Sequence, residues 1–202
     1  MLKQSVSSFV LFFLLSVPGA IFSQSKSLDW DIQFLNNESG ESMPINKTIR
    51  METGQHFQLA INAEEDCYCY VIIYDSQHQI YVWYYEPAKK VSEIKPKALR
   101  LTEPSGTETV YVIVSSSRQG ELERLLTQFK NSSSSQNTDN LYREIVRLQD
   151  AASGLGEPAT AIIPGGVSAR EVTNAGVPAD DKSFSTKFTG KELYVRAIGV
   201  RH

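Results

Sequence analysis

The chain has 202 residues, a formal net charge of −3, 41% hydrophobic residues and 21% charged residues. This composition is typical of one globular domain and excludes a fibrous or wholly disordered protein. Lysines and arginines are scattered rather than clustered, so the sequence lacks the basic surface that nucleic-acid binding requires. We therefore expect no nucleic-acid partner.

The N-terminal residues 1–23 have the pattern of an export signal, because Lys3 precedes a short apolar run from Phe9 to Val17. This run is shorter than the ~20 residues that span a bilayer, which favours cleavage after Ser23 over a retained anchor. Residues 24–202 are then predicted to form one β-rich domain. We expect it to be periplasmic or secreted, and not membrane-spanning after cleavage.

Seven segments after the signal have the pattern of β-strands. Strict alternation in "WDIQFL" and "HFQLAIN" predicts half-buried strands, with polar residues on one face. By contrast, "CYCYVIIY" and "VYVIVS" are apolar on both faces, as in strands that are covered on both sides. The predicted strands are residues 30–35, 56–62, 67–74, 79–85, 98–101, 110–115 and 192–200.

Two helices and a long loop interrupt the strand pattern. Apolar residues at helical spacing predict helices at about 118–130 and 139–152, joined by the polar linker "NSSSSQNT", with Thr138 or Asp139 as the N-cap. Residues 153–183 have no sustained periodicity and are predicted to form a long, loosely packed loop. The fold class is therefore mainly β (α+β). We expect an antiparallel β-sandwich with two accessory helices, built from residues 30–116 and 192–200.

Cys67 and Cys69 are the two cysteines of the chain. On a strand they share one face, where Val71 and Ile73 follow them toward the core. Their expected Cα separation of ~6.5–7 Å is at the limit for a disulfide, and a zinc site normally needs four ligands. We therefore interpret them as small buried hydrophobic residues, with a strained or intermolecular disulfide as the alternative. We expect no metal and no cofactor.

Aromatic residues gather on the predicted hairpin from residue 67 to residue 85. Tyr81, Trp83 and Tyr85 are predicted to share one face of their strand, and "CYCYVIIY" carries three further tyrosines on one face. One interpretation is cross-strand core packing. The other is an aromatic platform for a partner, over which residues 153–183 lie loosely until the partner binds.

The stretch from "ETGQHFQLAINAEEDCYCYVIIYDSQHQIYVWYYEP" through "ALRLTEPSGTETVYVIVSSSRQGELERL" resembles a bacterial family of exported or membrane-linked proteins, the domain-of-unknown-function family DUF 4384. The resemblance covers about residues 50–125. It rests on Gly54 and Phe57, the strand from Asp66 to Val71, Pro87, "GTE" at 106–108 and Ser115, whereas "DSQHQ" lacks the family's turn glycine. The resemblance implies the cysteine strand as a structural motif, and it implies no catalytic residues.

We therefore expect a non-catalytic, exported module of the cell envelope that binds a protein or other ligand, or has a structural role. The expected partner is an envelope protein or glycan, and self-association into a homo-oligomer is an alternative. The contrasting hypothesis is an exported hydrolase directed at glycans or peptides. The sequence has neither a G-x-S-x-G elbow nor an H-E-x-x-H motif. A pair of carboxylates for glycoside cleavage is defined by the distance between them in the folded protein, so the sequence does not exclude it.

Overall fold

The computed structural model of the chain describes residues 27–45, 48–153, 161–164 and 184–202. Its strands are β1 (Leu28–Asn36), β2 (Ser42–Met43), β3 (Ile49–Arg50), β4 (His56–Tyr74), β5 (Ile80–Tyr85), β6 (Val91–Ile94), β7 (Leu99–Arg100), β8 (Thr107–Ser115), β9 (Ala161–Pro164), β10 (Phe184–Lys191) and β11 (Leu193–Arg201). Its helices are α1 (Gly120–Asn131) and α2 (Ser135–Ser153).

The long strand β4 is the centre of the sheet, because different strands pair with its two halves. Residues Phe57 to Ala63 pair with β1, and β7 also pairs with this half. β6 pairs with Ile61 and Asn62 and, beyond a register shift, with Cys67. Residues Tyr68 to Tyr74 pair with β8, and β5 pairs with this half as well. The strand order is β3-β11-β8-β4-β1-β10-β9, and the pairs are antiparallel except for β3 with β11.

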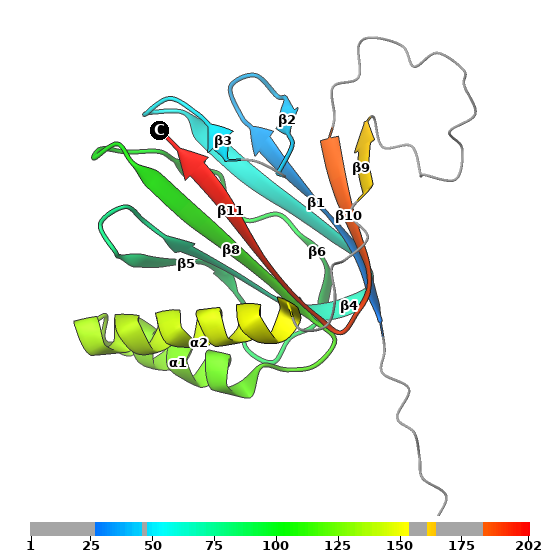
Figure 1. Cartoon of the computed structure of the whole chain (residues 1–202), viewed down its shortest axis with the longest axis vertical. Helices are drawn as coiled ribbons and strands as arrows, with labels where there is room; N and C mark the ends of the chain where they lie inside the picture. The colour runs from blue at the N-terminus through cyan, green and yellow to red at the C-terminus, as the bar shows by residue number, and fades with distance from the viewer. Residues whose placement is uncertain (1–26, 46–47, 154–160, 165–183) are drawn as a thin grey trace, which may run out of the picture.

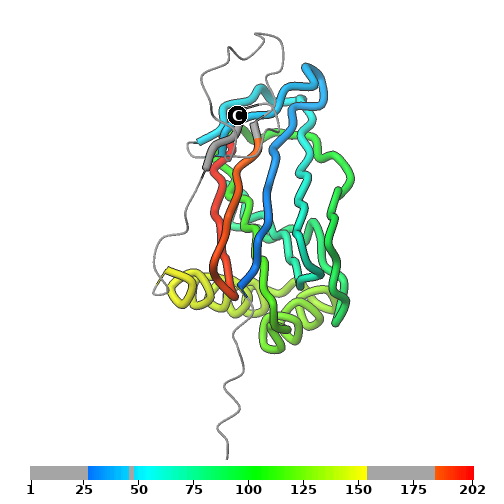
Figure 2. The backbone as a smooth tube through the Cα atoms, turned by 90° about the vertical axis from the view of Figure 1, so that its right-hand side faces the viewer, coloured from blue at the N-terminus to red at the C-terminus, as the bar shows by residue number. Residues whose placement is uncertain are grey.

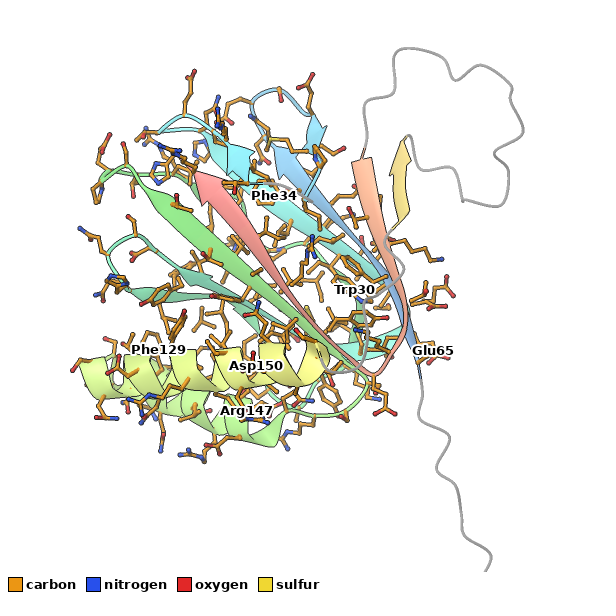
Figure 3. All side chains as sticks on the ribbon, in the orientation of Figure 1. Trp30, Phe34, Glu65, Phe129, Arg147 and Asp150 are labelled. Carbon is orange, nitrogen blue, oxygen red and sulfur yellow. The ribbon has the colours of Figure 1, made fainter. Side chains whose placement is uncertain are left out.

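The sheet curves until it is nearly barrel-shaped (Figures 1 and 2). Its two arms meet where β10 passes into β11 through Glu192, since β10 pairs with β1 whereas β11 pairs with β8. Trp30 and Phe34 lie inside the curve (Figure 3). Trp30 stacks on Phe188 with ring centroids 4.4 Å apart, and Phe34 stacks on Phe57 at 4.9 Å. Both stacks join neighbouring strands across the inner face.

Buried side chains from both arms fill this inner face, which we call the inner cluster. Its members include Trp30, Phe34, Phe57, Leu59, Cys67, Cys69, Val71, Val112, Phe188, Tyr194 and Ile198. The same arm that carries β8 has a second apolar face, and both helices cover it (Figure 1). This helix-facing cluster contains Tyr70, Ile72, Ile80, Tyr111, Ile113, Leu122, Leu125, Leu126, Leu141, Ile145 and Leu148.

A buried polar network fastens α1 to the sheet. Tyr70 donates its hydroxyl hydrogen bond to Glu123 Oε1 at 3.0 Å, and Arg118 Nε donates to Glu123 Oε2 at 2.6 Å. Glu123 is 3% exposed, so its charge depends on these donors for the stabilisation that water supplies elsewhere. Burial is also the main reason that the pKa of Tyr70 is raised, which keeps its hydroxyl protonated as a donor.

The structure confirms the mainly β class, the two helices and the strand positions that the sequence predicts. It does not confirm a sandwich of separate sheets, because all strands in the described part of the chain belong to one curved sheet. The predicted linker was wrong in its second half. Helix α2 begins at Ser135, and Ser134 Oγ accepts the backbone N–H of Asn137, the role predicted for Thr138 or Asp139.

Two predicted boundaries also change. The predicted strands at 56–62 and 67–74 are parts of the single strand β4. The predicted loop 153–183 contains the strand β9, which pairs with β10, and β10 was not predicted at all. The predicted signal, residues 1–23, and most of 153–183 lie outside the described residues. Neither described helix is long and apolar enough to span a membrane.

Candidate functional site

Strand β5 lies at an edge of the curved sheet. It pairs with β4 on one side, and no second strand pairs with it in the part of the chain that the structure describes. An edge strand presents unpaired N–H and C=O groups, to which an extended segment of another protein can add as a new strand. The edge of β5 is therefore a candidate interface.

The three aromatic residues of the predicted platform do not share one face. Val82 pairs with Ile72 and Tyr84 pairs with Val71, so Trp83 is the extra residue of a β-bulge. Because a bulge reverses the alternation, Trp83 packs against the inner cluster, whereas Tyr85 packs against the helix-facing cluster. The prediction of a common face was wrong for this reason.

Tyr81 is the aromatic residue of this strand that a partner can reach. It is 54% exposed, and no other large hydrophobic residue in the described ranges is as exposed. Trp83 meets Phe57 edge-on at 5.2 Å, and its Nε1 donates to the carbonyl of Lys97 at 2.9 Å. Tyr85 stacks on Tyr70 at 5.7 Å. Tyr81 therefore projects from a strand whose neighbouring aromatic residues are fixed.

The segment predicted to lie over the aromatic face of β5 is mostly outside the described part of the chain. Residues 154–160 and 165–183 lie outside the described residues, so the expectation that they lie over the aromatic face stays a prediction.

Cys67 and Cys69 are both buried and belong to the inner cluster, as predicted. The Sγ of Cys67 donates to the carbonyl of Val91 at 3.4 Å. Burial raises the pKa of Cys67 to about 11, and it raises that of Cys69 well above its ordinary value. Because the thiolate is the reactive form, such thiols are poor nucleophiles at neutral pH.

One row of side chains has the order of groups found in serine hydrolases. Thr53 Oγ1 lies 3.2 Å from Nδ1 of His202, and Nε2 of the same ring lies 3.5 Å from Glu108 Oε1. Burial raises the pKa of Glu108, although the nearby His202 acts in the opposite direction. The sequence did not single out this row because it joins three distant segments.

The surroundings of this row do not favour acyl transfer. The side chain of His202 is 0% exposed. The neighbouring backbone N–H groups of Gly54, Ser105 and Gly106 already donate to Leu101 O, Glu103 Oε2 and His202 O. An oxyanion hole needs donors that are free to meet developing charge on a substrate, and these three are occupied.

A groove of about 370 Å³ lies between α1 and α2 and was also missed by the sequence analysis. Its lining residues are Glu121, Arg124, Leu125, Asn140, Arg143, Glu144 and Arg147. The spacing of Arg143 and Arg147 places both on one face of their helix, which the sequence alone shows. The packing of α1 beside this face, which forms the groove, could not be predicted from the sequence. Among the described residues, no group of three His, Cys, Asp or Glu residues is placed to hold a metal ion.

Comparison with known proteins identifies no relative: no family model, no curated protein and no solved structure matches the chain. The resemblance to DUF 4384 therefore stays a prediction.

Proposed function

We propose that the protein is a non-catalytic, exported module of the bacterial cell envelope that binds an envelope protein through the free edge of β5. The carrying observation is the position of Tyr81, half exposed on an edge strand beside a fixed tryptophan. Aromatic side chains on a rigid support are frequent anchors of protein interfaces. In this proposal the partner contributes an extended strand, whose backbone pairs with β5 while its side chains contact Tyr81.

The export pattern of residues 1–23 supports a location in the periplasm or outside the cell. We also propose that the two arms of the sheet act as the two layers of a sandwich, since the inner cluster lies between them. A glycan partner and a second copy of this chain are the alternatives to a protein partner. Charge gives no support to nucleic acid.

The proposal is tested by changing the edge without changing the core. Tyr81→Lys places a charge on an exposed edge position, a substitution that natural edge strands use to prevent pairing. We expect it to abolish co-purification of the partner from solubilised native envelopes. Gln33→Lys is the matched control, because it adds the same charge on β1, which pairs with the other half of β4 from β5. Equal recovery of the partner with both variants contradicts the proposed interface.

A hydrolase is the second candidate function, and the row of Thr53, His202 and Glu108 is the observation that favours it. The occupied N–H groups around the row weigh against it. The test is hydrolysis of p-nitrophenyl acetate by the wild type and by Thr53→Ala. We expect the two rates to be equal. A wild-type rate well above that of Thr53→Ala would replace the non-catalytic proposal with a hydrolase.

A further inference from the structure

The groove between α1 and α2 is lined by charged side chains on both walls. Three arginines face two glutamates, so one positive charge remains in the lining. The outer surface of a helical pair is often a solvated face whose ion pairs contribute little. The arrangement of these five residues nevertheless differs from scattered surface pairs in three respects.

First, two of the arginines are held in fixed orientations. Arg124 donates to both oxygens of Glu121, with Nε 2.8 Å from Oε2 and Nη2 2.6 Å from Oε1. Arg147 makes the same paired contact with Glu144, at 2.7 Å for both bonds. Each guanidinium has five N–H donors, so further donors remain after these contacts. A ligand that accepts hydrogen bonds from these remaining donors binds side chains that are already ordered, so less side-chain entropy is lost on binding.

Second, the charges interact across the groove rather than only along each helix. The pKa of Glu121 is lowered, mainly by its hydrogen bond with Arg124, and the charge of Arg147 on the other helix lowers it further. Glu144 is 7% exposed, so its carboxylate lies in the floor rather than at the rim. Arg147 extends from α2 on the outer side of the helix pair (Figure 3).

Third, Arg143 has no ion pair in the part of the chain that the structure describes. It lies one helical turn before Arg147 on the same face of α2. Like charges at this spacing destabilise a helix by a few tenths of a kcal/mol. An anion placed between the two guanidinium groups would remove this repulsion, so binding and helix stability are coupled at this position.

We propose that this groove binds an acidic peptide segment of a protein partner. The guanidinium fork matches the two oxygens of a carboxylate, which makes arginine well suited to this ligand. The groove is open and has walls from two helices, so several carboxylates along an extended segment reach Arg143, Arg147 and Arg124 together. The whole chain carries a net charge of −3, so general attraction does not explain binding of an acidic peptide.

The experiment measures fluorescence polarisation of fluorescein-labelled hexaglutamate mixed with the purified protein at low ionic strength. We expect saturable binding that weakens with added salt, and no binding of labelled hexaglutamine. Arg143→Glu should weaken binding by at least about tenfold, the effect of one charge-assisted contact. Arg143→Gln should weaken it in the same direction.

The matched control is Arg50→Glu, which makes the same charge change at an exposed position of β3, away from the helices (Figure 1). It should leave hexaglutamate binding unchanged. The helical signal in circular dichroism confirms that each variant is folded. Absence of binding by the wild type overturns the proposal, and so does an equal loss in Arg143→Glu and Arg50→Glu. Because Tyr81 is not involved, this result is independent of the β5 interface.

Discussion

Residues 56–63 and 67–74 belong to the same strand but have different surroundings. In the first half, Phe57, Leu59 and Ile61 enter the inner cluster, while Gln58 and Asn62 on the opposite face remain partly exposed. In the second half, Cys67, Cys69, Val71 and Ile73 enter the inner cluster, while Tyr70 and Ile72 enter the helix-facing cluster.

The difference between the two halves explains the difference in their sequences. In the first half, the outer face has no helix over it and carries polar side chains, so polar and apolar residues alternate along the strand. In the second half, the face under α1 and α2 carries apolar side chains, so the alternation is lost. The sequence therefore indicates the helices in two places. Each helix has its own apolar stripe, and the strand that the helices cover is apolar on both faces. The predictions below begin with residues in the second half of β4 and end with an ion pair on the exposed outer face.

The largest expected effect is on the helix-covered half. Ile72 is 0% exposed in the helix-facing cluster, and Ile72→Ala should lower the free energy of unfolding by about 2–5 kcal/mol. Gln33→Ala on the bare face of the neighbouring strand β1 should change it by less than about 0.5 kcal/mol. Urea titration followed by circular dichroism measures both. Equal losses would mean that the two halves are covered alike.

Alkaline pH should also act on the second half. Burial, assisted by the charge of Asp66, raises the pKa of Cys67 from its ordinary 9.0 to about 11. The folded state then holds a proton that the unfolded state releases, so this contribution is complete below pH 9 and is lost as the pH rises to 11. The loss is up to about 3 kcal/mol.

Cys67→Val removes this titration while keeping a small apolar side chain. Its urea midpoint should fall less between pH 8.5 and pH 10.5 than that of the wild type, although Cys69 and Tyr70 add to the fall in both proteins. An identical fall in the two proteins would show that Cys67 does not contribute.

A smaller effect is expected where the sheet joins α1. Tyr70→Phe removes the hydroxyl that donates to the buried Glu123 and that accepts the backbone N–H of Gln119. Arg118 remains as a donor, so the expected loss is about 1–3 kcal/mol. Thermal unfolding monitored at 222 nm measures it. A variant as stable as the wild type would mean that the network does not fasten the helix.

The smallest effect is expected on the bare face. Lys187 Nζ lies 2.9 Å from Glu64 Oε1, with both side chains well exposed. The pKa of Lys187 is raised mainly by this contact, but water and salt screen the pair. Lys187→Ala should change the free energy of unfolding by less than about 1 kcal/mol. A larger loss in the same urea assay would show that the outer face is not a solvated one.

Several strands of this fold could be predicted from the local pattern of polar and apolar residues. Alternation located β1, and runs apolar on both faces located the second half of β4 and most of β8. Strand β10 was missed because the long segment before it has no period. The signal was the alternation of Thr186 and Phe188 with Ser185 and Lys187, which was overlooked beside the glycines and prolines.

The candidate sites were less predictable because they depend on pairing and packing. The bulge at Trp83 depends on the pairing register between β4 and β5, and no residue of "IYVWYY" predicts it. It turns Tyr85 toward the helix-facing cluster, whereas Trp83 packs against the inner cluster. The helical groove depends on how α1 approaches α2, which two separate amphipathic patterns do not specify.

The most direct test of the proposed function is photo-crosslinking in intact native envelopes. A p-benzoylphenylalanine replaces Tyr81 in one variant and Gln33 in the other, so the probe lies either on the edge of β5 or on the bare face of β1. The proposal predicts one discrete protein adduct from position 81 and none from position 33. The same adducts from both positions, or no adduct from position 81, would contradict it.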